Sequence, residues 1–238
     1  MLKLILVHTN GRIGSMSYNI LNNKYDTLFE GIYFIQKHYP YYNKNKLVDT
    51  YSNIKYSIQM IEESLLEDYY FDIGKIYKMI IFDIFIGNSD RHHSNWAIKH
   101  KREKNKNMTY VTLDLCPLYD NGSSLCAYED NNDLNIFFKD KMKFEALVNT
   151  KSKSAIGWKN ERPIRHFELL KKIRDNNYDL TITYIEKIKN NINEKSLDKI
   201  LKEFDNNIIN KDMKRLLKMY LLERRKRMLR IYNLKDEE

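Results

Sequence analysis

The sequence predicts an α+β fold that is mostly helical, with one small β-hairpin flanked by two polar loops. Only 7 Gly and 3 Pro occur in 238 residues, so the chain has few helix breakers and long helices are expected. Hydrophobic residues recur with a helical period through most of the chain, but they alternate with polar residues near positions 95–116, as in strands. Hydrophobic residues make up 42% of the chain, which is enough to bury a sizeable core.

The first 87 residues contain one predicted strand and two predicted helices. The apolar run LKLILVH ends in the turn signal TNGRIG, which predicts a strand that leaves into a turn. Residues 17–39 mix turn and helix signals, and residues 51–70 predict a helix with polar caps at Ser52 and Asn53. Residues 71–87 predict a central helix, because they are apolar on nearly every face.

The middle of the chain predicts the hairpin. Apolar and polar residues alternate in NWAIKH and in MTYVTLDLC, and the segment KREKNKN between them has no apolar member. We expect two strands joined by a solvated tip. The next segment, PLYDNGSSL, is predicted to be irregular.

Helical signals return at about Phe137 and continue to the end of the chain. The last predicted helix, residues 211–232, carries Met213, Leu217, Tyr220 and Leu221 on one face. Its run ERRKR, residues 223–227, is predicted to be a solvated helix face.

Charge and cysteine content suggest no specialised partner. The net charge of +9 is compatible with a polyanion, but the basic residues are spread along the chain and no nucleic-acid motif accompanies them. We therefore do not expect direct nucleic-acid binding, and a binder that uses the ERRKR helix is the weaker alternative. Two cysteines are too few for a disulfide framework, and no signal peptide or membrane span is predicted. We expect a cytoplasmic protein with no membrane partner.

The segment GNSDRHHSNW, residues 87–96, concentrates groups that bind water, metal or phosphate directly after the apolar helix. Phosphoryl transfer by kinases needs a carboxylate that orients the attacking hydroxyl, together with oxygen ligands for Mg²⁺. The common arrangement places an Asp five positions before an Asn, and a second Asp after a hairpin. Asp90 precedes Asn95 by five positions, and Asp120 follows the predicted hairpin. This register predicts a catalytic and Mg²⁺-binding site.

Each of these residues also has a simpler explanation. Asp90 and Asp120 are residue types that favour turns, and Asn95 could bind backbone groups at the start of a strand. The shared register favours the site. A two-histidine metal site at His92 and His93 is not expected, because adjacent residues do not share a face of a regular element. We expect His92 to brace the loop.

The two polar loops resemble the signature of HipA-like kinases, which are bacterial serine/threonine protein kinases found as toxins beside a helix-turn-helix antitoxin. The family pattern is Asp-(Arg/Gly)-His-x-x-Asn, a hairpin, and (Pro)-Leu-(Tyr/Phe)-Asp-x-x-Ser. It is met by Asp90, Arg91, His92 and Asn95, and then by Pro117, Leu118, Tyr119, Asp120 and Ser123. The resemblance is strong over roughly residues 70–130 and weaker in NGRIGSMSYNIL and SAIGWKNERPIRHFELL.

The resemblance implies a fold and a set of site residues. The chain would be a protein-kinase-like C-terminal lobe, with residues 1–150 as its core and residues 151–238 as a helical extension of the same lobe. The catalytic residues would be Asp90, as the base, and His92. Mg²⁺ and ATP would be held by Asn95 and Asp120.

The start of the chain would then resemble the hinge between the kinase lobes. The adenine of ATP would meet the strand LILVH at Val7 and His8. Members of this family carry an N-terminal lobe before the hinge, with a phosphate-covering loop and a lysine. The seven glycines here form no glycine-rich loop, so we expect the N-lobe to be absent or reduced. A separate N-lobe polypeptide, a truncated reading frame and a pseudokinase remnant are the three explanations.

The function expected from the resemblance is phosphoryl transfer from ATP to a Ser or Thr hydroxyl of a protein substrate. Kinases of lipids and small molecules share the same register, so the motif alone does not fix the acceptor. The alternative function is a catalytically inactive, kinase-like module that binds a helix-turn-helix antitoxin or another protein.

Overall fold

The computed structural model describes residues 4–9, 12–21, 23–66, 71–105, 108–130 and 133–236. The strands are β1 (Leu4–Thr9), β2 (Arg12–Ser17), β3 (Thr27–Glu30), β4 (Tyr42–Asn43), β5 (Val48–Asp49), β6 (Ala97–Asn105), β7 (Met108–Leu115), β8 (Lys153–Ser154) and β9 (Ile164–Arg165). The helices are α1 (Gly31–His38), α2 (Ile58–Leu66), α3 (Gly74–Ile86), α4 (Asn135–Lys139), α5 (Lys141–Glu145), the π-helical turn η1 (Ala146–Thr150), α6 (His166–Asn191), α7 (Glu194–Lys202) and α8 (Lys211–Ile231). The described residues thus combine helices with several small antiparallel sheets, where the sequence predicts helices and one hairpin.

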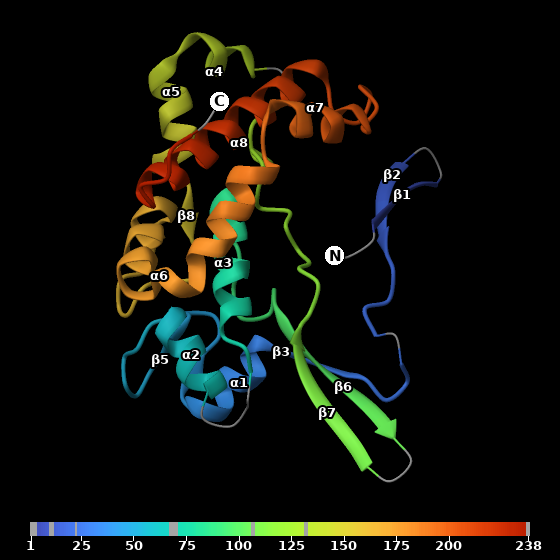
Figure 1. The fold of residues 1–238 in the computed structure, drawn as a ribbon, viewed down its shortest axis with the longest axis vertical. Helices are drawn as coiled ribbons and strands as arrows, with labels where there is room; N and C mark the ends of the chain where they lie inside the picture. The colour runs from blue at the N-terminus through green and yellow to red at the C-terminus, as the bar shows by residue number, and fades with distance from the viewer. Residues whose placement is uncertain are drawn as a thin grey trace.

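Helix α3 is the centre of the fold. Its side chains are apolar on nearly every face, and Ile76, Tyr77 and Ile84 are completely buried. A helix of this kind must be surrounded by other elements, and α6 and α8 pack against it (Figure 1). Their contributions to the shared core include Leu169, Leu170, Ile173, Leu216 and Met228. The C-terminal helices therefore complete the core around α3.

The predicted hairpin is present and belongs to a three-stranded sheet of order β3-β6-β7. Ile98 of β6 pairs with Phe29 on one side and Leu115 on the other. The strand continues to Asn105, so most of the segment expected to be a solvated tip is paired with β7 instead. Polar residues can form the backbone hydrogen bonds of a strand as well as apolar ones. The tip itself, residues 106–107, lies outside the described residues.

Helix α2 begins later than its sequence predicts. The expected caps Ser52 and Asn53 are wrong, because the helix starts at Ile58. Asn53 instead has a left-handed backbone, with φ of 57°, which short polar residues tolerate in turns. The side-chain oxygen of Ser57 accepts the backbone N–H of Met60 at 3.3 Å, so Ser57 caps the helix.

The helical tail differs from its prediction at the ERRKR run. Arg224 is fully buried and Arg225 is 4% exposed, so the expectation of a solvated face is wrong for both. The reason is the phase of the helix: Arg224 falls on the same stripe as Leu217, Leu221 and Met228.

The remaining differences concern how helices are divided. Part of the helical signal forms the long helix α6, which has a non-helical backbone at Asn177. The segment near Phe137 is instead split into α4, α5 and η1, and Asp140 caps α5 by accepting the N–H groups of Met142 and Lys143.

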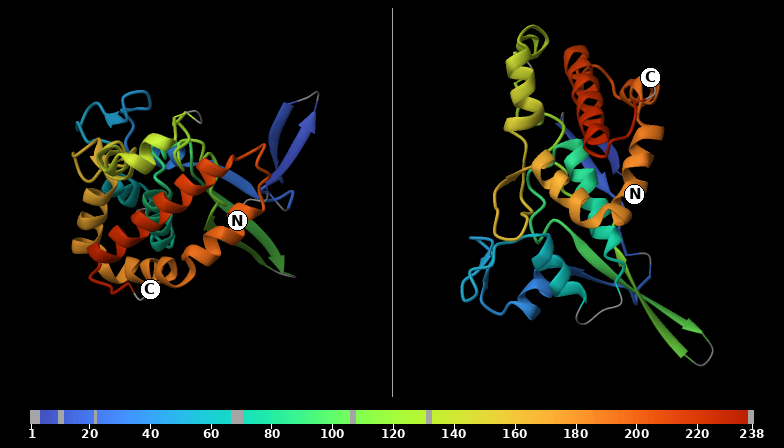
Figure 2. Two further views of the ribbon diagram at one scale, coloured as in Figure 1. Left: turned by 90° about the horizontal axis from the view of Figure 1, so that it is seen from above. Right: turned by 60° about the vertical axis from the view of Figure 1, so that its left-hand side comes forward.

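The β1–β2 hairpin projects from the helical body in Figure 1 and in the left-hand view of Figure 2. Its first strand is predicted by the sequence, and β2 is an addition. In its register Val7 pairs with Gly14 and His8 with Ile13. No described helix combines the length and the hydropathy that crossing a membrane requires.

Candidate active site

The first polar loop leaves helix α3 through Gly87. This residue has φ of 73° and donates its N–H to Asp83, which closes the last turn of the helix. A Cβ atom at this position would lie 2.0 Å from the hydroxyl of Tyr220. Glycine is therefore needed both for the backbone conformation and for the close approach of α8.

Arg91 anchors the loop to α3 through an ion pair in the interior. Its Nε and Nη2 atoms donate to the two carboxylate oxygens of Asp83, each at 2.9 Å. Burial raises the pKa of Asp83, and the guanidinium of Arg91 acts against that rise. A paired arrangement of this kind fixes orientation as well as charge.

The same guanidinium ties the first loop to the second. Nη1 of Arg91 donates to the carbonyl oxygens of Asn95 and Tyr119, both at 2.6 Å. Nη2 donates to Oδ1 of Asn121 at 2.5 Å. Asp120 lies between the two residues of the second loop that Arg91 holds. The structure thus brings the loops that carry Asp90, Asn95 and Asp120 side by side.

Two further contacts close the loops together. The backbone N–H of Ser89 donates to the carbonyl of Ser123 at 3.1 Å. The hydroxyl of Tyr119 donates to the carbonyl of Ser94 at 3.1 Å. The loops are therefore held at several points along their length.

Asp90 has a fixed backbone and an exposed side chain. Its N–H donates to Oδ1 of Asn88 at 3.1 Å, and its carbonyl accepts Nδ2 of Asn95 at 2.7 Å. Its side chain is 53% exposed, and Nε2 of His92 lies 4.0 Å from the carboxylate. The carboxylate can thus receive a proton from a bound hydroxyl.

Asn95 and Asp120 have side-chain oxygens that fit a hard cation. Because Nδ2 of Asn95 is engaged by Asp90, Oδ1 is its remaining group, and it makes no hydrogen bond with the described residues. The exposed carboxylate of Asp120 likewise has no partner there. No group of three His, Cys, Asp or Glu side chains with metal-binding geometry occurs among the described residues. One carboxylate and one amide oxygen suit Mg²⁺, which keeps several waters and binds phosphate oxygens.

The second loop has unusual backbone conformations. Asp120, Leu125 and Cys126 have φ of 51°, 54° and 59°. Such conformations cost about 1–3 kcal/mol each and are found disproportionately at functional sites. For Leu125 the cost is offset in part by its N–H bond to the carbonyl of Ile86 at 3.0 Å.

The two adjacent histidines have different environments. His92 is partly exposed, and its Nδ1 accepts the N–H of Ser94 at 3.2 Å. His93 is buried, and its Nδ1 lies 3.0 Å from the hydroxyl of Tyr42. Burial lowers the pKa of His93 to about 4, so this residue is neutral near pH 7. His92 makes a contact within the loop, and its catalytic role stays a prediction.

A hollow of about 500 Å³ lies beyond the second loop. The hydroxyl of Tyr128, which lines it, is 2.7 Å from Oγ of Ser123, so the hollow adjoins that loop. Its other lining residues are Glu129, Asp130, Asp133, Ile136, Phe137, Lys143, Ala146 and Lys151.

Three residues of this site were not predicted as a group from the sequence: Asp83, Asn88 and Arg91. A signal was present, because Asp83 is a lone carboxylate in an otherwise apolar stretch of α3. A carboxylate at a buried position needs a partner, and Arg91 follows eight positions later. Of the expected nucleotide contacts, Val7 and His8 lie in β1 and their side chains lie outside the described part of the chain.

Comparison with known proteins gives a structural relative. No protein-family model matches the sequence, and no curated protein matches it. Among solved structures, a Helicobacter pylori proinflammatory kinase, CtkA, superposes with a TM-score of 0.72. The fold is kinase-like. The alignment covers 98% of this chain and 78% of that chain at 16% identity, so the likeness concerns the fold.

Proposed function

We propose that the chain is the catalytic lobe of an ATP- and Mg²⁺-dependent kinase of the HipA-like type, which transfers a phosphoryl group to a Ser or Thr hydroxyl of a protein. One observation carries this proposal: Arg91 joins the loop of Asp90 and Asn95 to the loop of Asp120. Both loops follow the elements expected of them, an apolar helix and a hairpin. The kinase-like fold supports the same assignment.

Each site residue has a proposed role in phosphoryl transfer. Asp90 would accept the proton of the attacking hydroxyl and hold that oxygen toward the phosphate. Asn95 and Asp120 would hold Mg²⁺, which when bound supplies positive charge beside the phosphate oxygens. His92 would keep the loop in shape around Asp90. Catalysis of this type depends on positioning, which the buried anchor of Arg91 provides.

Two different segments would bind the acceptor and the adenine. The hollow beside Tyr128 adjoins the loop of Asp120, and we propose that the protein substrate binds there. The backbone at Val7 and His8 would meet the adenine. A helix-turn-helix antitoxin would be a further partner.

The test is a phosphate-transfer assay with labelled ATP, with and without the product of the sequence immediately upstream. Wild type should transfer label to protein in the presence of Mg²⁺. Asp90→Ala should reduce the rate about 10²- to 10⁴-fold. The matched control is Asp179→Ala, which removes an exposed carboxylate from α6 and should leave the rate unchanged.

Two results would overturn the assignment. One is equal activity of wild type and Asp90→Ala. The other has two parts. Wild type, supplied with the upstream product, transfers no phosphate, and it binds a protein partner even when Asp90, Asn95 and Asp120 are replaced. That second result would establish the non-catalytic binding module instead.

A further inference from the structure

Arg224, in the ERRKR run of α8, contacts the C-terminal end of α3. Its Nε donates to the carbonyls of Ile84 and Phe85, at 2.9 and 3.1 Å. Nη2 donates to the carbonyl of Ile84 as well, and Nη1 to the carbonyl of Val148 at 2.6 Å. The guanidinium thus caps the last turn of the helix that precedes the Asp90 loop.

The charge of Arg224 has no carboxylate partner among the described residues. The carbonyl end of a helix carries partial negative charge, which stabilises a cation placed there. The rings of Phe167 and Tyr220 lie 4.8 and 5.2 Å from the guanidinium carbon, within the range of cation–π attraction. A buried charge is costly unless its donors are satisfied, and here each nitrogen has an acceptor.

His166, the first residue of α6, continues this network toward the loop. Its Nδ1 faces Nη2 of Arg224 at 3.2 Å and Oγ of Ser152 at 2.5 Å. Since a guanidinium only donates, Nδ1 must be the acceptor and Nε2 carries the proton. Nε2 therefore donates to the carbonyl of Asn88 at 2.9 Å. Burial and the neighbouring guanidinium both lower the pKa of His166, which keeps the ring neutral.

Asn88 passes this constraint to Asp90. Its carbonyl is held by His166, and its Nδ2 donates to Asp83 at 2.9 Å. Its Oδ1 accepts the backbone N–H of Asp90. The carbonyl, Nδ2 and Oδ1 of the buried Asn88 are therefore all hydrogen-bonded. The bond from Oδ1 fixes the backbone of Asp90, the proposed catalytic residue.

We propose that Arg224 and His166 are positioning residues, through which the C-terminal helices hold Asn88 and thereby the backbone of Asp90 in place. The kinetic part of this inference rests on the proposed kinase function; the structural part does not. Supporting groups of this kind matter because small displacements of a reacting group reduce rate strongly.

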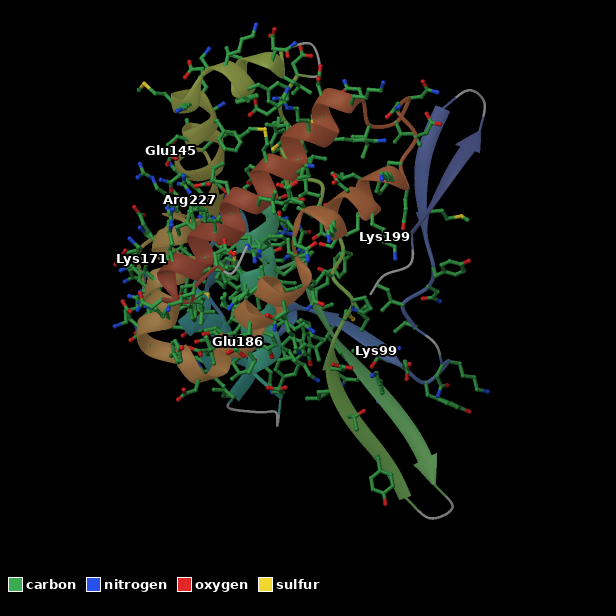
Figure 3. The ribbon with its side chains drawn as sticks, turned by 45° about the horizontal axis from the view of Figure 1, so that its top comes forward. Lys99, Glu145, Lys171, Glu186, Lys199 and Arg227 are labelled. Atoms are coloured by element: carbon green, nitrogen blue, oxygen red, sulfur yellow. The ribbon has the colours of Figure 1, made fainter. Side chains whose placement is uncertain are left out.

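The neighbouring arginines of the run serve other contacts and supply a control. Arg225 is also buried, but it pairs with Asp236 at 2.6 Å and donates to the carbonyl of Lys189 at 3.1 Å. Arg227 pairs with Glu145 where α8 meets α5 (Figure 3). Loss of Arg225 should thus disturb α8 without touching Asn88.

The first test is hydrogen exchange of backbone amides in residues 88–95. His166→Phe keeps an aromatic ring, although a larger one, but removes the donor to Asn88, and should speed exchange about threefold to tenfold. His166→Gln restores an N–H donor and should exchange as wild type does, and so should Arg225→Met. Unchanged exchange in His166→Phe, or equal acceleration in Arg225→Met, would overturn the inference.

The second test is kinetic. His166→Phe should lower kcat about 10- to 100-fold with little change in KM for ATP, and His166→Gln should recover most of the rate. A lower kcat in both variants, or a rise in KM alone, would contradict a positioning role. Arg224→Met should resemble His166→Phe in both assays; should it fail to fold, the two His166 variants decide. If wild type transfers no phosphate, the proposed function fails while the exchange result still decides the structural part.

Discussion

Arg91 and Asp83 form a two-point ion pair with side-chain exposures of only 1% and 5%. Arg91→Met would leave Asp83 charged, buried and without its counter-ion. Breaking a buried pair in this way costs about 3–5 kcal/mol, and urea unfolding of the variant should show a loss of that size.

The double variant Arg91→Met, Asp83→Leu separates stability from function. Replacing both charges by apolar groups removes the cost of an unpaired buried charge, so the double variant should regain part of the stability. The rest stays lost because Asn88, Asn95 and Tyr119 lose hydrogen-bond partners. It should not regain phosphate transfer, because the bonds from Arg91 to both loops stay lost. Recovery of transfer along with stability would show that the Arg91 bridge is not needed.

Gly87→Ala should be strongly destabilising for two separable reasons. The left-handed backbone costs about 1–2 kcal/mol for a residue with Cβ, and the new methyl would overlap the hydroxyl of Tyr220. Adding Tyr220→Phe removes that hydroxyl. The double variant should therefore regain the stability lost to the overlap, but not the stability lost to the backbone conformation. Thermal unfolding of the three variants measures the difference, and strict additivity would contradict the predicted contact.

Stability should fall on acidification because His93 is buried and neutral. Its pKa is about 4 in the folded protein and about 6.5 in an unfolded chain. Between these values the unfolded state binds more protons, so the free energy of unfolding decreases as pH falls. His166, whose pKa is also lowered, acts in the same direction.

Urea unfolding at pH 7, 6, 5 and 4.5 checks this dependence. The His93 contribution should be about 1–3 kcal/mol, and His93→Gln should flatten the profile by that amount. If the variant and the wild type lose stability in parallel, His93 is not the group responsible.

The sequence predicted the elements that hydrophobic periodicity defines. Helix α3 and the β6–β7 hairpin are found where their patterns place them, since the apolar face of each must be buried. The caps of α2 were predicted wrongly, because several polar residues precede the apolar run. Contacts with the rest of the fold decide which of them caps the helix, and here it is Ser57.

The sequence carries the spacing of the proposed site residues, but it gives little signal for the residues that support them. Asp90, Asn95 and Asp120 follow a spacing set by kinase chemistry, whereas Arg224 acts through contacts made some 140 positions away along the chain, with Ile84. A charged run predicts a solvated face on composition alone. The phase of Arg224 with Leu217 and Leu221 was the signal that it lies inside.

The most direct measurement of the central claim is a titration with Mn²⁺ and ATP followed by the backbone amide signals of both loops. Mn²⁺ substitutes for Mg²⁺ at oxygen ligands and broadens nearby signals. Residues 88–95 and 119–123 should broaden together in wild type, and Asp120→Ala should abolish the effect at both loops. Broadening confined to one loop, or unchanged broadening in Asp120→Ala, would contradict a single metal and nucleotide site shared by Asn95 and Asp120.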